Sequence, residues 1–336
     1  MDLKQLTELN AVSGHEQLMR RTLLEELKDC GAQVSIDRMG NVIAEKKGTS
    51  AATPKRIMVA AHMDEVGLIV TGATEDGFLR IAPIGRVDSR VLISKRVVVG
   101  DEKIPGIIGA MAIHLQTAAD RKRVLSFDDI YVDIGAKDKA EAQQKAPLGA
   151  YVAFDTPYVT FGDGCACAKA LDSRTGVWNL LRLMKKDYPC DLTIMFSSEK
   201  EVGFRGAKGG AFAKDPDAAL VLDGTDANDL GMTDEVWHCC EQGKGVAVSF
   251  MDSTSIGDRT LFKLALKTAE EANIPCQVKQ TTAGGNDAGV IQRARGGIPT
   301  LVLSVPCRYM HSPSSTVKLC DVDAQLALTE ALLMKL

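Results

Sequence analysis

The alternation of apolar and polar positions is interrupted most sharply at Ile57–Gly67, which reads IMVAAHMDEVG. Five apolar residues without a charge are followed at once by His62, Asp64 and Glu65. Such a run predicts a strand covered on both faces, as at the centre of a sheet flanked by helices. The carboxyl ends of strands in α/β sheets commonly carry functional groups, so we expect a site at this position.

Further apolar runs predict strands of the same sheet, and amphipathic segments predict helices that cover it. The helix expected at 14–30 begins with Ser13 and Glu16, which form a capping-box pattern. A hairpin is expected at 34–48, around a turn at Gly40. The other predicted strands lie in the segments 192–196, 217–229, 246–250 and 299–313, and the other helices at 258–273 and 321–336. This pattern predicts an α/β fold with a mixed sheet flanked by helices.

The segment 68–160 differs in character, because short stretches rich in Val, Ile and Gly replace the helical periodicity. Its one helical pattern, at 137–146, is polar and is expected on the surface. We therefore predict an inserted, all-β domain at 68–160. The α/β domain would then consist of residues 1–67 and 161–336.

Composition excludes several classes of partner. The 336 residues carry a formal net charge of −4 without a basic block, which argues against nucleic acid or an anionic membrane and favours a small substrate. The absence of an apolar run of 18 residues and a polar start lead us to expect a cytoplasmic protein. Nine cysteines without a CxxC pair indicate reduced thiols, not a disulfide framework.

Histidines and carboxylates recur where apolar runs end. His62, Glu201, Asp223 and His311 each follow such a run, and Asp172 stands at a helix start between the first two. Each residue alone has an ordinary explanation, such as a helix cap for Asp172. Together they predict a site assembled by the fold, with imidazole and carboxylate ligands suited to two Zn, Co or Mn ions. A glycosidase is disfavoured, since its two carboxylates need no histidine.

The order of the motifs along essentially the whole chain resembles that of the M42 metallo-aminopeptidases, a family that includes glutamyl and deblocking aminopeptidases and tetrahedral particles. The segments that carry the resemblance are VSGHE, GNVIAEKKG, AHMDEVG, ALDSRTG, EVGFRGA, VLDGTDAND and GGIPTLVLSVPCRYMHSP. The resemblance implies a metal-dependent enzyme that removes N-terminal residues from small peptides. It also implies that 68–160 is a dimerisation domain. The homo-oligomer would be a dodecamer built from the resulting dimers.

Transferred by position, the resemblance gives each candidate residue a role. Asp172 is implied to be the ligand that bridges two divalent transition-metal ions. One ion would be completed by Glu201 and His311, and the other by His62 and Asp223. Asp64 is implied to orient His62, as a carboxylate behind a metal-binding histidine commonly does.

The chain departs from the family pattern at the position of the general base. Two adjacent glutamates stand before Val-Gly in the family, but here the pair is Lys200 and Glu201. We expect Glu199 to replace the missing base imperfectly and to leave weak activity. The alternative is a catalytically impaired particle that binds metal or peptide without efficient turnover. Neither the residue preference nor the identity of the metal follows from the sequence.

Overall fold

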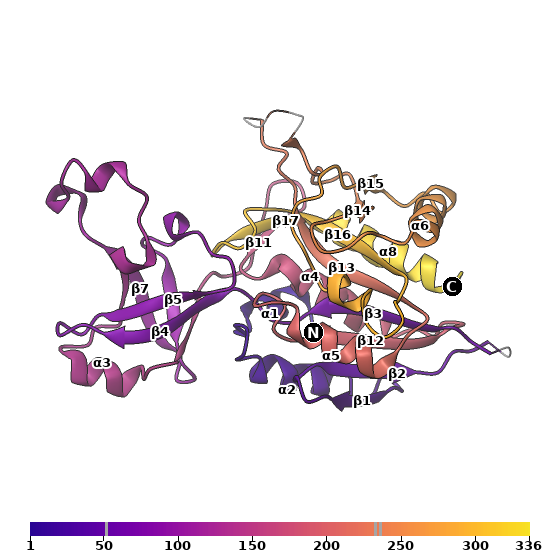
Figure 1. Ribbon diagram of the computed structural model, residues 1–336, viewed down its shortest axis with the longest axis horizontal. Coiled ribbons are helices and arrows are strands. Elements are labelled where there is room, and N and C mark those ends of the chain that lie inside the picture. The colour runs from indigo at the N-terminus through magenta and orange to yellow at the C-terminus, as the bar shows by residue number, and fades with distance from the viewer. Residues whose placement is uncertain (51–52, 232–233, 235–236) are drawn as a thin grey trace.

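The computed structural model describes residues 1–50, 53–231, 234 and 237–336. It consists of a large α/β part and a smaller β-rich part that projects from it along the longest axis of the molecule (Figure 1). No helix in the described ranges is long and apolar enough to cross a membrane.

Within the described residues, eleven strands form one mixed sheet. Its central strands β12, β3, β13 and β16 are parallel in this order, so their carboxyl ends meet at one edge. The strands of this sheet are β1 (Gln33–Ile36), β2 (Val42–Lys46), β3 (Arg56–His62), β10 (Val159–Phe161), β11 (Cys165–Ala168), β12 (Asp191–Ser197), β13 (Ala218–Asp226), β14 (Val246–Ser249), β15 (Cys276–Val278), β16 (Thr300–Arg308) and β17 (Ser315–Lys318).

Helices cover both faces of this sheet. On one face α4 packs against β3 and β13 and α8 packs against β16, while α5 and α7 pack on the opposite face. The helices are α1 (Leu3–Glu8), α2 (Gln17–Glu26), α4 (Leu171–Leu183), α5 (Arg205–Lys214), α6 (Arg259–Glu271), α7 (Ala288–Ile291) and α8 (Leu319–Leu333).

The strand β3 joins the two hydrophobic cores. Val59 and Ala61 point into the core with α4, whereas Met58 and Ala60 point into the core with α5. This alternation explains why the run beginning at Ile57 has no polar position, and it confirms a strand buried on both faces.

The β-rich part is a closed barrel of six strands in the order β4, β5, β8, β7, β6 and β9, within the described residues. It contains β4 (Gly67–Ala73), β5 (Leu79–Ile84), β6 (Arg96–Val99), β7 (Ile104–Ala110), β8 (Ile130–Asp133), β9 (Tyr151–Phe154), the helix α3 (Lys139–Lys145), and the short 3₁₀ turns η1 (Ser89–Val91), η2 (Ile113–Leu115), η3 (Asp120–Lys122) and η4 (Phe127–Asp129). Leu68, Val132 and Phe154 belong to its separate apolar core. The inserted all-β character expected for 68–160 is thus present, while the domain boundaries themselves stay a prediction.

One local prediction is wrong. Helix α2 starts at Gln17, and no side chain caps its amino end. The Ser13 hydroxyl instead donates to Asp64 Oδ2, 2.6 Å away. The local capping-box pattern therefore gave no indication of this contact, which joins segments far apart in the sequence.

Candidate metal centre

The five residues predicted as metal ligands lie together at the carboxyl edge of the central strands. His62 ends β3, Asp223 lies within β13 and Glu201 follows β12. Asp172 is in the first turn of α4, and His311 is in the turn after β16. We call these five residues the metal-centre cluster.

The first half of the cluster, the His62 half, contains His62, Asp172 and Asp223. His62 Nε2 lies 3.4 Å from Asp172 Oδ1 and 3.4 Å from Asp223 Oδ1. All three residues are at most 7% exposed. Three ligand atoms of this kind, all within 4.8 Å of one another, can surround one metal ion.

The second half, the His311 half, contains Asp172, Glu201 and His311. His311 Nε2 lies 3.5 Å from Asp172 Oδ2 and 3.5 Å from Glu201 Oε2. This nitrogen is buried, yet it has no hydrogen-bond partner among the residues that the structure describes. A buried nitrogen aimed at two carboxylates without a hydrogen bond fits a metal ligand better than a structural histidine.

Asp172 belongs to both halves, because its two oxygens face different histidines. Its Oδ1 also accepts a hydrogen bond of 3.0 Å from the backbone N–H of Gly224. A Cβ at position 224 would lie 2.8 Å from that oxygen, so the close approach requires glycine. Helix α4 has Ala170 as its N-cap and no side-chain cap, which removes helix capping as the explanation of Asp172.

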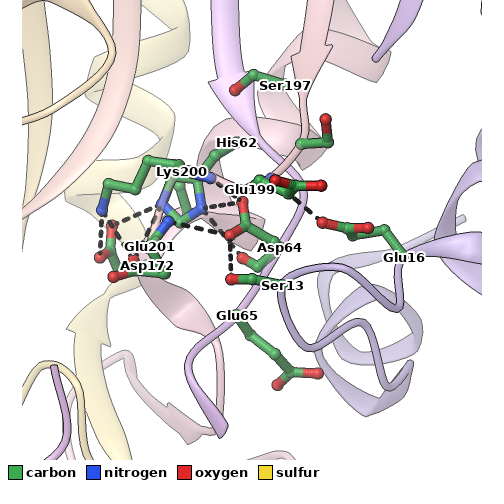
Figure 2. A network of polar contacts seen from close by, with 12 residues as sticks. Ser13, Glu16, His62, Asp64, Glu65, Asp172, Ser197, Glu199, Lys200 and Glu201 are labelled. Carbon is green, nitrogen blue, oxygen red and sulfur yellow. Dashed lines mark hydrogen bonds and ion pairs between the residues drawn. The ribbon is translucent and has the colours of Figure 1, made fainter. Parts of the chain in front are cut away.

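Asp64 lies next to the cluster and helps to position its residues (Figure 2). His62 Nδ1 lies 3.0 Å from the backbone carbonyl of Asp64 and 3.4 Å from its carboxylate. A proton on Nδ1 would donate to that carbonyl and leave the lone pair of Nε2 directed at the cluster. The Asp64 carboxylate accepts hydrogen bonds from the backbone N–H groups of Lys200 and Glu201, at 3.0 and 3.1 Å. It therefore fixes ligands of both halves.

Lys200 projects into the cluster. Figure 2 shows its ammonium directed at Asp172 and Glu201, with Nζ 3.3 Å from Asp172 Oδ2 and 2.9 Å from Glu201 Oε1. Burial lowers the pKa of Lys200, but the charges of Asp172, Asp223 and Glu201 outweigh this and raise that pKa well above its ordinary value. Position 200 thus carries a positive charge among carboxylates.

The carboxylates and the cationic groups of the cluster stabilise one another's charged forms. Burial raises the pKa of Glu201, but the charges of Lys200 and His311 outweigh it and lower that pKa to about 2. Burial lowers the pKa of His311, but Asp172 and Glu201 raise it to about 10. Such a set of buried carboxylates and imidazoles suits cations, so the residues fit divalent metal ions.

The structure does not bring Glu199 into this group. Its carboxylate pairs with Arg205, at 3.3 Å, and its backbone N–H donates to Glu16, at 3.2 Å. In Figure 2 Glu199 lies toward Glu16, on the side away from Asp172 and Glu201. The expectation that Glu199 reaches a water at the metal centre thus finds no support in the geometry.

Two residues beside the site were not predicted from the sequence to belong to it. Ser13 donates to Asp64, and Asp287 accepts a hydrogen bond of 2.5 Å from Ser197. Burial raises the pKa of the Asp287 carboxyl to about 7. Asp287 lies in a loop whose many glycines and polar residues predict only a turn, so no local signal marks it.

The cluster opens onto a cleft of about 900 Å³. Glu201, Asp223 and His311 contribute to its wall, together with Lys200 and with residues of the loops that follow β13 and β15, among them Lys279. A cleft of this volume accommodates the end of a peptide chain.

Comparison with known proteins agrees with this arrangement. Residues 40–328 match the family model described as M42 glutamyl aminopeptidase. The chain is 35% identical to the lysyl aminopeptidase of Pyrococcus furiosus, over 99% of this chain and 96% of that protein.

Solved structures agree as well. The TET aminopeptidase of the marine sediment archaeon Thaumarchaeota archaeon SCGC AB-539-E09 has a TM-score of 0.95 at 30% identity, covering 99% of this chain and 95% of that one. The TET1 peptidase of Pyrococcus horikoshii, described as assembling into a tetrahedron or a large octahedral shell, has a TM-score of 0.88 at 32% identity, covering 99% and 98%. With the family match and the clustered ligands, these likenesses establish that the chain belongs to the M42 peptidase family and is a metal-dependent aminopeptidase.

Proposed function

We propose that the chain removes N-terminal residues from small peptides with two divalent transition-metal ions, Zn, Co or Mn. His62, Asp172 and Asp223 would hold one ion, and Asp172, Glu201 and His311 the other. The observation that carries this proposal is the shared Asp172, whose two oxygens face two separate groups of ligand atoms. A carboxylate between two such groups is the usual bridge of a two-metal hydrolase.

When bound, the ions would polarise the scissile carbonyl, lower the pKa of a water and attract the free amino group of the peptide. The residues of the chain supply orientation. Asp64 would hold His62 in the tautomer that presents Nε2, and Gly224 holds Asp172 in place. The cleft beside Glu201 and His311 would receive the N-terminal residue.

The general base is the part of the reaction that the residue at position 200 affects. Lys200 stands at the position where the family has a glutamate, and its ammonium faces Asp172 and Glu201. A protonated lysine donates and cannot accept a proton. We therefore propose that proton transfer from water is slow in this protein relative to a chain with glutamate at 200.

We also propose that the protein assembles through its barrel, as dimers that build a dodecamer. Ile107, Ile113, Leu115 and Val124 are each more than half exposed on the barrel and its long loop. A contiguous exposed apolar patch commonly marks a protein interface, and we propose that these side chains form one. The TET1 peptidase of Pyrococcus horikoshii, which can assemble into a tetrahedron or a large octahedral shell, supports this proposal.

A cytoplasmic location stays a proposal. None of the nine cysteines, all of which lie in the described part of the chain, is paired in a disulfide. Free thiols fit a reducing compartment.

The test uses the full chain, stripped of metal and then reconstituted with Zn²⁺, Co²⁺ or Mn²⁺. Hydrolysis of leucyl, glutamyl and lysyl amide reporters should appear only with metal, and an N-acetylated reporter should not be cleaved. Metal uptake without hydrolysis of any free-amino reporter would contradict the proposal.

A further inference from the structure

The Lys200 side chain is an unusual occupant of a cation-binding site. It is 5% exposed, and its Nζ lies 2.9 Å from Glu201 Oε1, 3.3 Å from Asp172 Oδ2 and 3.9 Å from Asp223 Oδ1. All three carboxylates are proposed metal ligands. The ammonium therefore already balances part of the charge that metal ions would balance.

Its contacts are not shared equally between the two halves. The two shorter contacts reach Glu201 Oε1 and Asp172 Oδ2. His311 Nε2 lies 3.5 Å from the same Asp172 Oδ2 and 3.5 Å from the other oxygen of Glu201, Oε2. The His62 half uses the other oxygen of Asp172, and its Asp223 oxygen is the most distant of the three. The ammonium thus competes mainly for the ligands of the His311 half.

The exposed fractions of the two histidine ligands also distinguish the two halves. The His62 side chain is 2% exposed and the His311 side chain 31%. A cation at the buried His62 half would be surrounded by fixed ligands. A cation at the His311 half would meet a positive charge close by, and that repulsion would weaken its binding by roughly a hundredfold or more.

We propose that the Lys200 ammonium is an internal cation of the metal centre, which makes the two ions bind unequally and leaves the His311 half as the weak site. This inference rests on the proposed two-ion function. In the protein with one ion, Lys200 neutralises Glu201 and the second oxygen of Asp172. Binding of the second ion displaces the ammonium toward the cleft, whose wall already includes Lys200.

The experiment titrates metal-free, full-length protein with Co²⁺ and follows bound ion by equilibrium dialysis and visible absorption. The native protein should show two classes of site, with dissociation constants at least about a hundredfold apart. Lys200→Gln and Lys200→Met should tighten the second site by about a hundredfold and leave the first nearly unchanged.

Lys279→Gln is the matched control, since Lys279 is a second buried lysine of the same cleft. Its Nζ donates to the backbone carbonyl of Ala283, at 2.9 Å, so its removal should not change the Co²⁺ isotherm.

Thermal unfolding gives a readout that does not depend on turnover. Without metal, Lys200→Met leaves buried carboxylates without their cation and should lower Tm by about 5 °C or more. Saturating Co²⁺ should raise Tm more in this variant than in the native protein.

An unchanged second dissociation constant in both Lys200 variants would overturn the inference while leaving the two-ion proposal intact. Two native sites of equal affinity would overturn it as well. Failure of native protein and variants to bind any Co²⁺ would overturn the two proposals together.

Discussion

The two halves of the metal-centre cluster use the same kinds of ligand but are supported differently. His62 ends a strand buried on both faces, and its Nδ1 lies 3.0 Å from a backbone carbonyl. His311 lies in a turn beyond β16, has a φ of 54° and keeps 31% of its side chain exposed. One histidine is fixed by the sheet, and the other depends on a loop.

This difference shows that one part of a site can bind a cation while another part admits the substrate. In the His62 half, His62 itself lies in the core, where packing and hydrogen bonds define its geometry. Asp223, Glu201 and His311 face the cleft, where a peptide would arrive. Preorganised ligands bind tightly, and ligands on a loop adjust more readily.

The largest expected effect comes from the residue common to both halves. Asp172→Ala should reduce bound metal from two ions per chain to none under conditions that saturate the native protein, because each half loses a ligand. Metal analysis after dialysis measures this. Asp323→Ala, at an exposed position of α8, should keep both ions. Retention of one tightly bound ion in Asp172→Ala would show that the halves do not share this residue.

Loss of a ligand that belongs to one half should be more selective. Asp223→Ala should mainly empty the His62 half, and Glu201→Ala the His311 half, so each variant should retain about one ion. Co²⁺ absorption spectra of the two variants should then differ, since the remaining ligand sets differ. Identical spectra and stoichiometries would contradict the division into two halves.

A third pair of variants changes rate without removing a ligand. Lys200→Glu should raise kcat by about 10²–10⁴-fold at saturating metal, because it places a proton acceptor beside the cluster. Glu199→Gln should leave kcat nearly unchanged, as its carboxylate pairs with Arg205. Steady-state kinetics on one amide reporter compares them. A large fall in Glu199→Gln would restore Glu199 as the base.

The smallest effect concerns the support behind His62. Ser13→Ala removes the hydroxyl that donates to the buried Asp64 carboxylate at 2.6 Å. The free energy of unfolding should fall by about 1.5–3 kcal/mol, as for hydrogen bonds to charged groups. Urea denaturation of metal-free protein measures it, with Ser35→Ala on the exposed strand β1 as control. If the two variants are equally stable, the Ser13 hydroxyl does not stabilise the Asp64 carboxylate.

The sequence predicts those features that depend on local pattern. The apolar run before His62 predicts β3, and the order of such runs predicts that the five ligands meet at one sheet edge. The family resemblance adds how they divide between two ions, and this division stays a proposal.

Contacts made across the fold could not be predicted in the same way. Ser13 looks like a helix cap because its partner, Asp64, is 51 residues away. The closure of the barrel depends on pairing between β4 and β9, which no local pattern encodes. The backbone N–H of Lys200 likewise donates to Asp64, a residue 136 positions away.

That backbone hydrogen bond has an evolutionary consequence. Asp64 holds residue 200 through its main chain, and it holds the next residue, Glu201, in the same way. The side chain at 200 can therefore be exchanged without moving the neighbouring ligand. A single codon change at this position would alter the charge inside the centre and preserve its architecture, so relatives with different rates and metal requirements could arise from one scaffold.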